Sequence, residues 1–399
     1  MTASTNPERQ GLLWVLAAMN FVVGFGAFVV IGVLSPVADD YGISKASAGW
    51  IMTIYAIVYA VSSPLLVALS GRVDRTRVLM VGMGLFLLGA LTAVMAPSFE
   101  VLLAARVIMA LGGGLLTPVA ASIAIAGALP NQRGRALAIV FGGITLAQAV
   151  GVPVGAWLGY AFGWRSTFIL VSISAMVGLV AIWLRLPRGI KVVPASLGSL
   201  GGVLRSPHLM TAISFTAWFV GALYVVYTYL APLLEEQYGL ARDGVSLMLL
   251  IFGFGAVVGN ALGGRLTDRF GPTRTLVALC IAQIVVTPIL TMVTMPVVVA
   301  GIVVAAWSIV GWSFMVAQQS RLASLESNLV PVLFALNASA IYIGSAIGSA
   351  IGGWTIAAAG TELLGPVSVL ISGLAALSLL VTRALNPARS ERAISGDGH

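Results

Sequence analysis

The sequence predicts an all-α integral membrane protein with twelve transmembrane helices. Of its 399 residues, 59% are hydrophobic and only 9% are charged, whereas a soluble protein has about 25% charged residues. Apolar stretches of about 20 residues recur along the chain, which is the length that crosses a hydrocarbon core of about 30 Å as a helix. No alternating strand pattern is visible, and backbone groups in lipid must bond within their own segment, so we expect helices throughout.

The expected spans follow one another with short breaks between them. They cover roughly residues 11–36, 46–70, 78–96, 101–128, 135–160, 165–186, 209–234, 244–264, 274–294, 296–320, 330–358 and 362–383. The ninth and tenth spans are separated only by Thr294, Met295 and Pro296. The opening MTASTNPERQ precedes an apolar run that is too long for a signal peptide, so we expect the first helix to be retained.

The distribution of basic residues predicts the orientation in the membrane. Most of the 21 Lys and Arg residues fall in loops on one side of the predicted bundle. The other side receives only Lys45, Arg165 and Arg242, and Arg106 lies inside a span. The positive-inside rule places the basic side, and with it both termini, in the cytoplasm. The net charge of +8 therefore reflects membrane topology, and no nucleic-acid partner is expected.

Few residues are available for other chemistry. Cys280 is the only cysteine, and His208 and His399 are the only histidines, so we expect neither a disulfide framework nor a metal site. The sequence contains no nucleotide-binding loop, no catalytic motif in a polar segment and no loop long enough to form a domain. We therefore expect that the protein is not an enzyme and has no cofactor. Any transport would draw on a gradient and not on ATP.

Pairs of similar motifs indicate that the chain contains two related halves. The charged segment SGRVDRTR (70–77) is similar to GGRLTDRFGPTR (263–274), and PVADDYG (36–42) is similar to PLLEEQYG (232–239). A third pair consists of Gly151, Gly155 and Gly159 in the fifth span and Gly344, Gly348 and Gly352 in the eleventh. Parallel repeats of this kind are a recurring transporter architecture.

The repeats define the expected domain organisation. Residues 1–186 form an N-terminal six-helix half, 187–208 a cytoplasmic linker, 209–385 a C-terminal six-helix half, and 386–399 a cytoplasmic tail. The linker is rich in Gly, Pro and Ser and is the longest polar-leaning connection, so the two halves are expected to be joined there.

These motifs resemble those of the major facilitator superfamily over essentially the whole chain. GRLTDRFGPTR is similar to the family's G-x-L-x-D-R-x-G turn, and GRVDRTR is a shortened version of it. RVIMALGGG (106–114) resembles the fourth-helix R-x-x-x-G-x-G motif, with Ala110 where Gly is usual. GVPVGAWLG, followed by GWRSTF, resembles the antiporter motif of the drug:proton antiporter branch.

The resemblance implies a fold and a mode of action. The fold is two pseudo-symmetric six-helix bundles, which alternate in opening to either side of the membrane. The implied setting is the bacterial inner (plasma) membrane, with the lipid bilayer, protons and a small-molecule substrate as partners and a monomer as the working unit. The proton gradient is the implied source of energy.

The two charged segments are expected to act as conformational latches. An Asp at a helix end, close to another helix's positive N-terminus and to Arg residues, can hold the cytoplasmic ends of two helices together. The alternative is that these charges only fix the topology, although an acid is not needed for that purpose. The latch residues are Gly71, Asp74, Arg75, Gly264, Asp268, Arg269 and Gly271.

Candidate substrate-binding residues lie within the spans. Arg106 is the only charge placed clearly inside one, at a cost of at least about 2.5 kcal/mol, so we expect it to contact substrate or a protonatable partner. Snorkelling to the nearby surface is the alternative. The candidates are Asn20, Tyr55, Tyr59, Arg106, Gln148, Trp218, Tyr224, Tyr227, Trp307, Asn337 and Tyr342. Together they favour a neutral or weakly anionic molecule with rings or hydroxyls.

Two further sets of residues concern helix packing and protons. Gly151, Pro153, Gly155 and Gly159 form the antiporter-like motif: the glycines allow close helix approach, and the proline favours a bend. No acid is placed in the middle of a span, unlike in many antiporters of the family. The remaining proton-coupling candidates are Asp39, Asp40, Glu235 and Glu236, near the outer ends of the first and seventh spans. Ordinary interfacial solvation of these carboxylates is the alternative.

The predicted function is secondary active efflux of a small amphipathic compound, such as a drug, a sugar or a nucleoside-like molecule, in exchange for protons. An uncoupled facilitator or an uptake symporter on the same fold is the first alternative, favoured by the missing mid-span acid. A non-transporting membrane sensor or scaffold is the second. The short loops argue against it, because they leave no room for a sensory domain.

Overall fold

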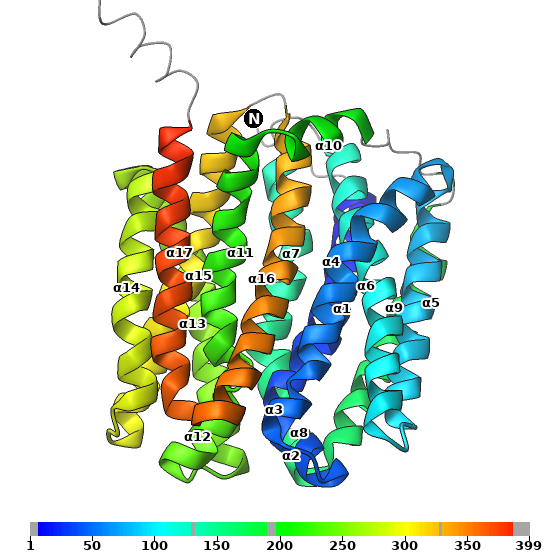
Figure 1. Cartoon of the computed structure of the whole chain (residues 1–399). Helices are drawn as coiled ribbons and strands as arrows, with labels where there is room; N and C mark the ends of the chain where they lie inside the picture. Colours follow the sequence, from blue (N-terminus) through cyan, green and yellow to red (C-terminus); the bar gives the residue numbers. More distant parts are fainter. Residues whose placement is uncertain (1–6, 129–131, 188, 190–196, 327–328, 386–399) are drawn as a thin grey trace, which may run out of the picture.

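The computed structural model describes residues 7–128, 132–187, 189, 197–326 and 329–385, and the regular structure in these residues is helical (Figure 1). Within them, twelve segments are long and apolar enough to cross a membrane, as the sequence predicts. These segments are Gln10–Gly32, Lys45–Arg72, Arg75–Val94, Phe99–Ala126, Arg135–Phe162, Trp164–Arg185, Pro207–Tyr238, Arg242–Phe270, Pro272–Met292, Val297–Leu325, Val332–Ala359 and Thr361–Ala384.

The spans are divided between two bundles. The N-terminal bundle contains α1 (Pro7–Phe28), the 3-10 turn η1 (Val29–Gly32), α2 (Leu34–Tyr41), α3 (Lys45–Ala48), α4 (Trp50–Leu69), η2 (Ser70–Arg72), α5 (Arg75–Val94), α6 (Phe99–Ala126), α7 (Arg133–Leu146), the π-helical turn η4 (Ala147–Gly151), α8 (Val152–Phe162) and α9 (Trp164–Arg185). The short helix α10 (Leu197–Leu204) follows. The C-terminal bundle contains α11 (Pro207–Tyr227), α12 (Leu230–Tyr238), α13 (Arg242–Phe270), α14 (Pro272–Met292), α15 (Val297–Leu325), α16 (Val330–Ala359), η6 (Thr361–Leu363) and α17 (Leu364–Ala384).

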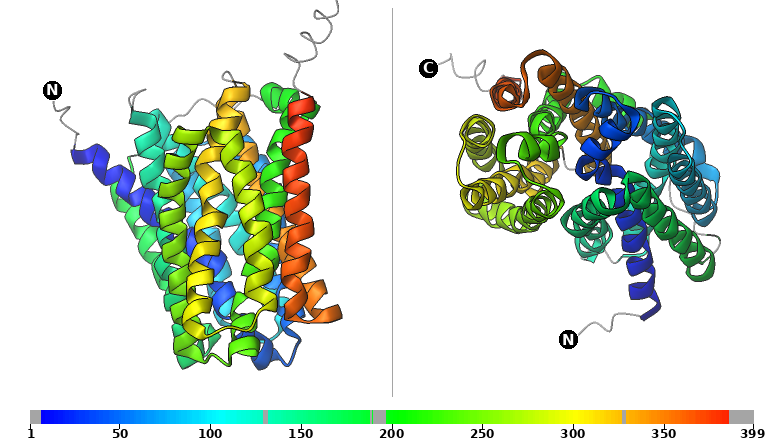
Figure 2. Two further views of the ribbon diagram at one scale, coloured as in Figure 1. Left: turned by 90° about the vertical axis from the view of Figure 1, so that its left-hand side faces the viewer. Right: turned by 90° about the horizontal axis from the view of Figure 1, so that it is seen from below.

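Each bundle packs mainly on itself. In the N-terminal bundle α5 packs on α6 and α9, and in the C-terminal bundle α13 packs on α15 and α11 packs on α16 and α17. The bundles meet along two seams, α4 against α16 and α8 with η4 against α13. Viewed from below, they lie side by side (Figure 2). In Figure 1 α10 lies at one end of the molecule and α2, α3 and α12 lie at the other, so we call these the α10 end and the α12 end.

The first span of each bundle is built from more than one helix, a break that the spans predicted over 11–36 and 209–234 did not include. The chain leaves α1, passes through η1 and enters α2, and in the second bundle a short turn separates α11 from α12. Pro36 and Pro232 are the third residues of α2 and α12. Because a proline cannot donate a backbone hydrogen bond, it is tolerated in the first turn of a helix but not in its interior. The repeated proline therefore marks the start of a new helix in both bundles.

A π-helical turn interrupts the fifth span. Pro153 lies just after it, at the start of α8, and offers no N–H to the carbonyl of Ala149, four residues earlier. Local π turns are one way in which a helix accommodates such a gap. At the position where a bend was expected from Pro153, the preceding turn is therefore π-helical and not α-helical.

The charged segment of the C-terminal bundle is mostly helical. The sequence placed the end of the eighth span at residue 264, but α13 continues to Phe270. Asp268 and Arg269 therefore lie on the last turn of a helix and not in a loop. The turn itself begins at Gly271, whose φ of 80° is a left-handed conformation that glycine adopts without steric cost.

Gly155 allows α8 to approach the chain just beyond α1. A Cβ atom built at Gly155 would overlap the side chain of Val29. Gly155→Leu is expected to lower the free energy of unfolding by about 1–3 kcal/mol, because the added side chain overpacks this contact. The midpoint of thermal unfolding of the purified protein, followed by tryptophan fluorescence in detergent, measures the effect.

The matched control for this substitution lies in the preceding helix. Gly142→Leu adds the same side chain to α7 at a position with no heavy atom within 4 Å of the added Cβ. It should leave the unfolding midpoint close to that of the wild type. Equal midpoints for the two variants would argue against the close packing at Gly155.

Candidate substrate site at the seam between the bundles

Tyrosine side chains from both bundles meet at the seam between α4 and α16. The ring of Tyr59 stacks on Tyr342 with centroids 3.6 Å apart, and Tyr55, about one turn earlier on α4, lies 6.4 Å from Tyr342. Tyr224 of α11 approaches Phe28 at the end of α1, with 6.4 Å between the ring centroids. Aromatic contacts therefore join the two bundles in two places.

A second group of rings extends into the C-terminal bundle. Tyr227 packs edge-on against Tyr224 and stacks on Phe252 of α13 with centroids 4.1 Å apart. Trp307 of α15 lies 5.2 Å from Phe252 and 6.5 Å from Tyr227. We call the six buried residues that the sequence had singled out the aromatic cluster: Tyr55, Tyr59, Tyr224, Tyr227, Trp307 and Tyr342.

Several polar atoms of the aromatic cluster have no hydrogen-bond partner in the described part of the chain. The hydroxyls of Tyr55, Tyr224 and Tyr227 and the indole N–H of Trp307 are buried and unpaired. A buried polar group without a partner costs about 1–3 kcal/mol. A ligand or water with complementary groups would recover this cost. Ring surfaces combined with a few free hydrogen-bonding atoms are typical of small-molecule sites.

The other predicted substrate-binding residues lie apart from the aromatic cluster. Asn20 donates from Nδ2 to the carbonyl of Leu16 within α1 at 3.3 Å, and Asn337 accepts from Thr216 at 2.5 Å. Gln148 lies in the π-helical turn, and Trp218 is half-buried on α11. None of these residues makes a ring contact or hydrogen bond with the aromatic cluster in the described residues.

Arg106 is fully buried in the N-terminal bundle and does not snorkel to the surface. Its terminal nitrogens donate to the carbonyls of Gly26 and Ala27 at 2.6 and 2.8 Å, and Nε donates to the carbonyl of Ile51 at 3.2 Å. Gly26 and Ala27 lie in the last turn of α1, where carbonyls lack partners within the helix. A cation there also matches the negative end of the helix dipole. Arg106 therefore caps the broken first helix.

The same guanidinium group supports the aromatic cluster. It lies over the ring of Tyr55, with 4.3 Å between the guanidinium carbon and the ring centroid. Since its hydrogen bonds are directed at backbone carbonyls, Arg106 holds α1, α4 and Tyr55 in place. Direct contact between Arg106 and a substrate stays a prediction.

The charged segment of the N-terminal bundle caps a helix at the α10 end. Asp74 accepts from the backbone N–H of Arg77 at 3.1 Å, which caps α5, and from the N–H of Gly189 at 2.7 Å. Arg75 is buried and donates to the carbonyls of Ser70 and Gly71, both at 3.4 Å. The Arg75 contacts hold the turn η2 within the segment, and the Asp74 contact with Gly189 ties the segment to the chain that follows α9.

The equivalent segment of the C-terminal bundle is free of such contacts. Asp268 and Arg269 are exposed on the last turn of α13, and neither makes a hydrogen bond or ion pair with another described residue. Within the described residues, no hydrogen bond joins either charged segment to the opposite bundle. A latch between the bundles at this end stays a prediction for another conformation.

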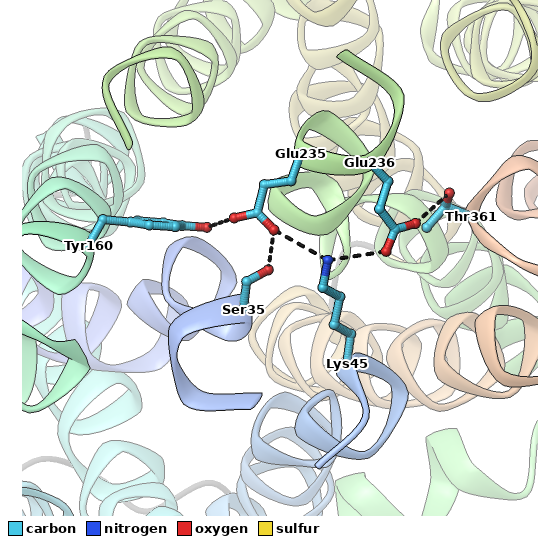
Figure 3. A network of polar contacts seen from close by, with 6 residues as sticks. All are labelled: Ser35, Lys45, Tyr160, Glu235, Glu236 and Thr361. Atoms are coloured by element: carbon cyan, nitrogen blue, oxygen red, sulfur yellow. Dashed lines mark hydrogen bonds and ion pairs between the residues drawn. The ribbon is translucent and has the colours of Figure 1, made fainter. Parts of the chain in front are cut away.

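The hydrogen bonds between the bundles are concentrated at the α12 end. Among the described residues they are Ser35–Glu235, Lys45–Glu235, Lys45–Glu236, Tyr160–Glu235 and Ser349–Gly49. Four of them converge on α12, as Figure 3 shows. The α12 end is therefore closed by polar contacts that have no counterpart among the described residues of the α10 end.

The repeated acidic pairs have different partners. Asp40 accepts from the indole of Trp164 at 2.9 Å and from Arg165 at 2.6 Å, all within the N-terminal bundle. These two hydrogen bonds lower the pKa of Asp40 below its ordinary value of 3.8. Glu235, by contrast, bonds to residues of the opposite bundle. Asp40 therefore stabilises the N-terminal bundle, whereas Glu235 stabilises the contact between the two bundles at the α12 end.

A cleft of about 250 Å³ opens on the α4–α16 seam near the α12 end. Its wall includes Trp50, Tyr229, Ser349 and Trp354. The lining does not include any member of the aromatic cluster, so the cleft is separate from the candidate substrate site.

Sequence reasoning missed several residues of these sites. Phe28 and Phe252 complete the aromatic contacts, but they could not be told from ordinary core residues by sequence. Ser35 and Tyr160 bond to Glu235, and Lys45 had been interpreted only as a marker of topology. A hydroxyl or cation near a repeated acidic pair is a signal that could have found them.

Two repeated bundles of membrane-spanning helices are a recurring architecture of membrane transporters. The sequence comparison supplies the family. Residues 16–332 match the model of the Major Facilitator Superfamily, and the chain belongs to this family.

Relatives and solved structures agree with this assignment. The chain is 33% identical over 368 residues to the uncharacterized MFS-type transporter YbcL of Bacillus subtilis (strain 168), covering 92% of this chain and 94% of the relative. It is 31% identical over 356 residues to YtbD of the same organism, covering 88% and 89%. A bacterial homolog of the human lysosomal transporter Spinster, solved in an inward-facing and unoccupied conformation, shares the fold, with a TM-score of 0.71, 18% identity and coverage of 96% and 95%.

Arg106→Lys is expected to destabilise the protein. A lysine offers one point of charge and cannot reach three carbonyls with the geometry of the guanidinium fork. Hydrogen bonds to charged groups contribute about 1.5–3 kcal/mol each, so the unfolding midpoint should fall clearly. The exposed Arg265→Lys on α13 is the control. A midpoint equal to that of the control would mean that Arg106 does not cap α1.

Proposed function

We propose that the protein is a secondary active efflux transporter, which exports a small amphipathic compound by alternating access in exchange for protons. The fold and the family support membrane transport of a small molecule. The proposal adds a direction, a class of cargo and a coupling ion. A drug, a sugar or a nucleoside-like compound is the expected cargo.

The distribution of charge supports an orientation with both termini and the α10 end in the cytoplasm. In this orientation the closed α12 end faces the outside. In an alternating-access cycle a transporter closed at its outer end is in the part of the cycle that can bind cargo from the cytoplasm once the inner end opens.

The aromatic cluster is the observation on which the proposed cargo rests. Its rings come from both bundles, so a molecule held between them would contact surfaces that move relative to each other. Its unpaired hydroxyls and indole N–H favour a ligand with both ring surface and hydrogen-bonding groups. No carboxylate contacts the cluster in the described residues, which favours a neutral or weakly anionic cargo over an organic cation.

Proton exchange is proposed from the antiporter-like motif of the fifth span and from four carboxylates. Asp39, Asp40, Glu235 and Glu236 are the coupling candidates, all near the α12 end. An uncoupled facilitator or an uptake symporter is the second candidate function. The observation that favours it is that the described residues include buried arginines but no buried Asp or Glu.

Transport is tested in proteoliposomes with an imposed pH gradient and a fluorescent pH reporter. Phenicols, lipophilic cations, sugars and nucleosides are added in turn. Dissipation of the gradient by one class supports antiport of that class. Counterflow of a labelled compound without proton movement would replace antiport by facilitated diffusion.

If the aromatic cluster binds the cargo, removing one of its unpaired hydroxyls should weaken transport. Tyr227→Phe removes an unpaired buried hydroxyl, so it should raise the KM for the cargo about fivefold while leaving the unfolding midpoint unchanged or slightly higher. Tyr229→Phe is the matched control, because its hydroxyl donates to the carbonyl of Ser349 at 2.8 Å. That variant should lower the midpoint. A Tyr227→Phe variant with wild-type KM would remove its hydroxyl from the substrate site.

The proposed latch at the charged segment of the C-terminal bundle is tested by substituting its acid. Asp268→Asn should reduce transport severalfold without affecting membrane insertion, because the carboxylate is free here and is expected to latch the α10 end in the outward-facing state. The initial rate of uptake into everted vesicles, normalised to the amount of inserted protein, is the measurement. Asp243→Asn, an exposed carboxylate near the other end of α13, is the control. Wild-type rates for Asp268→Asn would eliminate this latch.

A further inference from the structure

Two clefts join on the seam between α4 and α16. The cleft of about 250 Å³ near the α12 end shares Trp50, Thr53 and Ala350 with a second cleft of about 240 Å³. The second cleft continues along the seam toward the middle of both helices, where Val61 of α4 and Ile343 of α16 are part of its wall. We call the two clefts together the seam groove. One wall comes from the N-terminal bundle and the other from the C-terminal bundle.

The two ends of the seam groove differ in polarity. At the α12 end its wall includes the hydroxyls of Ser44 and Ser47. The second cleft is apolar beyond Thr53, whose hydroxyl already donates to the carbonyl of Gly49 at 3.4 Å. Its remaining wall is made of Ile, Val and Ala side chains together with Trp50. The groove therefore matches a molecule with a polar head and an apolar tail.

The apolar part of the seam groove has the length of one membrane leaflet. Trp50 and Val61 are eleven residues apart on α4, and Ile343 and Trp354 are eleven residues apart on α16. At 1.5 Å per residue this separation is about 16 Å, which is about half of a hydrocarbon core of about 30 Å. An extended acyl chain of one leaflet would therefore lie along the whole groove.

Two tryptophans mark the membrane interface at the mouth of the groove. Trp50 is 51% exposed at the start of α4, and Trp354 is 74% exposed near the end of α16. Tryptophan is enriched at the level of the lipid headgroups. Ser44 and Ser47 precede Trp50 on the α12 side, where a headgroup would lie. Figure 1 shows α4 and α16 packed side by side on the face toward the viewer.

We propose that the seam groove binds a phospholipid of the leaflet at the α12 end, with one acyl chain in the apolar part and the headgroup at Ser44 and Ser47. The two serine hydroxyls share a hydrogen bond at 2.9 Å. Only one of them donates in this contact, so the other can donate to an ester or phosphate oxygen. Because an acyl chain is already in apolar surroundings, close packing and the headgroup contact supply the affinity.

A lipid in the seam groove contacts both bundles at once. Its chain lies against α4 on one side and α16 on the other, so separation of the bundles at the α12 end would part the walls of the groove. The lipid therefore binds the closed arrangement more tightly, and a ligand that binds one state more tightly shifts the equilibrium toward that state. This role goes beyond the proposed function, because it requires neither cargo nor proton movement.

The test is photo-crosslinking of the full chain in lipid vesicles. The vesicles consist of phosphatidylethanolamine and phosphatidylglycerol, with a trace of phosphatidylglycerol that carries a diazirine in one acyl chain. Labelled peptides are identified by mass spectrometry after irradiation. Residues 57–61 and 343–350 should carry about fivefold more label than α14 around Ile281 and Val285, which are exposed without a groove. A fivefold preference corresponds to about 1 kcal/mol.

A substitution inside the groove makes the test specific. Ala350→Phe places a ring in the wall that both clefts share, so it should lower the label on α4 and α16 about fivefold and leave the label on α14 unchanged. Ala306→Phe is the matched control, since Ala306 is exposed on α15 and lines neither cleft. If Ala350→Phe does not fold, Ile57→Trp should reduce the label in the same way, because Ile57 lines the apolar part and is 43% exposed.

Three results would overturn the lipid site. The first is equal labelling of α14 and of the groove, and the second is full labelling of the groove in the folded Ala350→Phe or Ile57→Trp variant. The third concerns the cargo, because Ala60 and Ile343 directly follow Tyr59 and Tyr342 of the aromatic cluster. Loss of label on addition of a phenicol, a sugar or a nucleoside would assign the groove to cargo. Failure of proton exchange in proteoliposomes would leave the lipid site intact.

Discussion

The requirement that every backbone polar group in lipid find a partner determines how this protein can break its helices. α1 ends at Phe28, and the carbonyls of Gly26 and Ala27 in its last turn accept hydrogen bonds from the guanidinium of Arg106 on α6. That single contact permits the chain to change direction into η1 and α2. The break brings Ser35 to the seam, and the same guanidinium covers the ring of Tyr55. Both the closure and the aromatic cluster therefore depend on one buried cation whose charge is compensated by a helix end.

Most of the fold was predictable because lipid imposes simple rules on composition and length. Twelve spans, two repeated halves and the separation of α14 from α15 follow from apolar runs and from repeated motifs. The breaks in the first span of each half were not predicted, although Pro36 and Pro232 lie in the motifs that revealed the repeat. A proline in an apolar run is compatible with a bend, a π turn or a new helix, and tertiary contacts decide among them.

The candidate site was predictable in its residue types but not in its partners. Of the residues chosen as aromatic or polar members of spans, Tyr55, Tyr59 and Tyr342 meet at the seam between α4 and α16. Tyr224, Tyr227 and Trp307 form a second group in the C-terminal bundle. The partner of Arg106 could not be inferred, because backbone carbonyls carry no signature in the sequence. The network around Glu235 was missed for a related reason: Lys45 and Tyr160 approach α12 only after two bundles have been docked, and no local pattern encodes that docking.

Pseudo-symmetry makes the differences between the repeats informative. Asp40 and Glu235 arise from equivalent motifs, yet the shorter side chain bonds to Arg165 within its own bundle and the longer one bonds to the opposite bundle. At the α10 end the same division holds, since Asp74 is engaged locally whereas Asp268 is exposed. The two acids of the N-terminal repeat, Asp40 and Asp74, thus stabilise their own bundle. In the C-terminal repeat Glu235 bonds to the opposite bundle, and Asp268 makes no hydrogen bond or ion pair with another described residue. An alternating-access cycle needs one such contact for each closed end, and the two need not be satisfied in the same conformation.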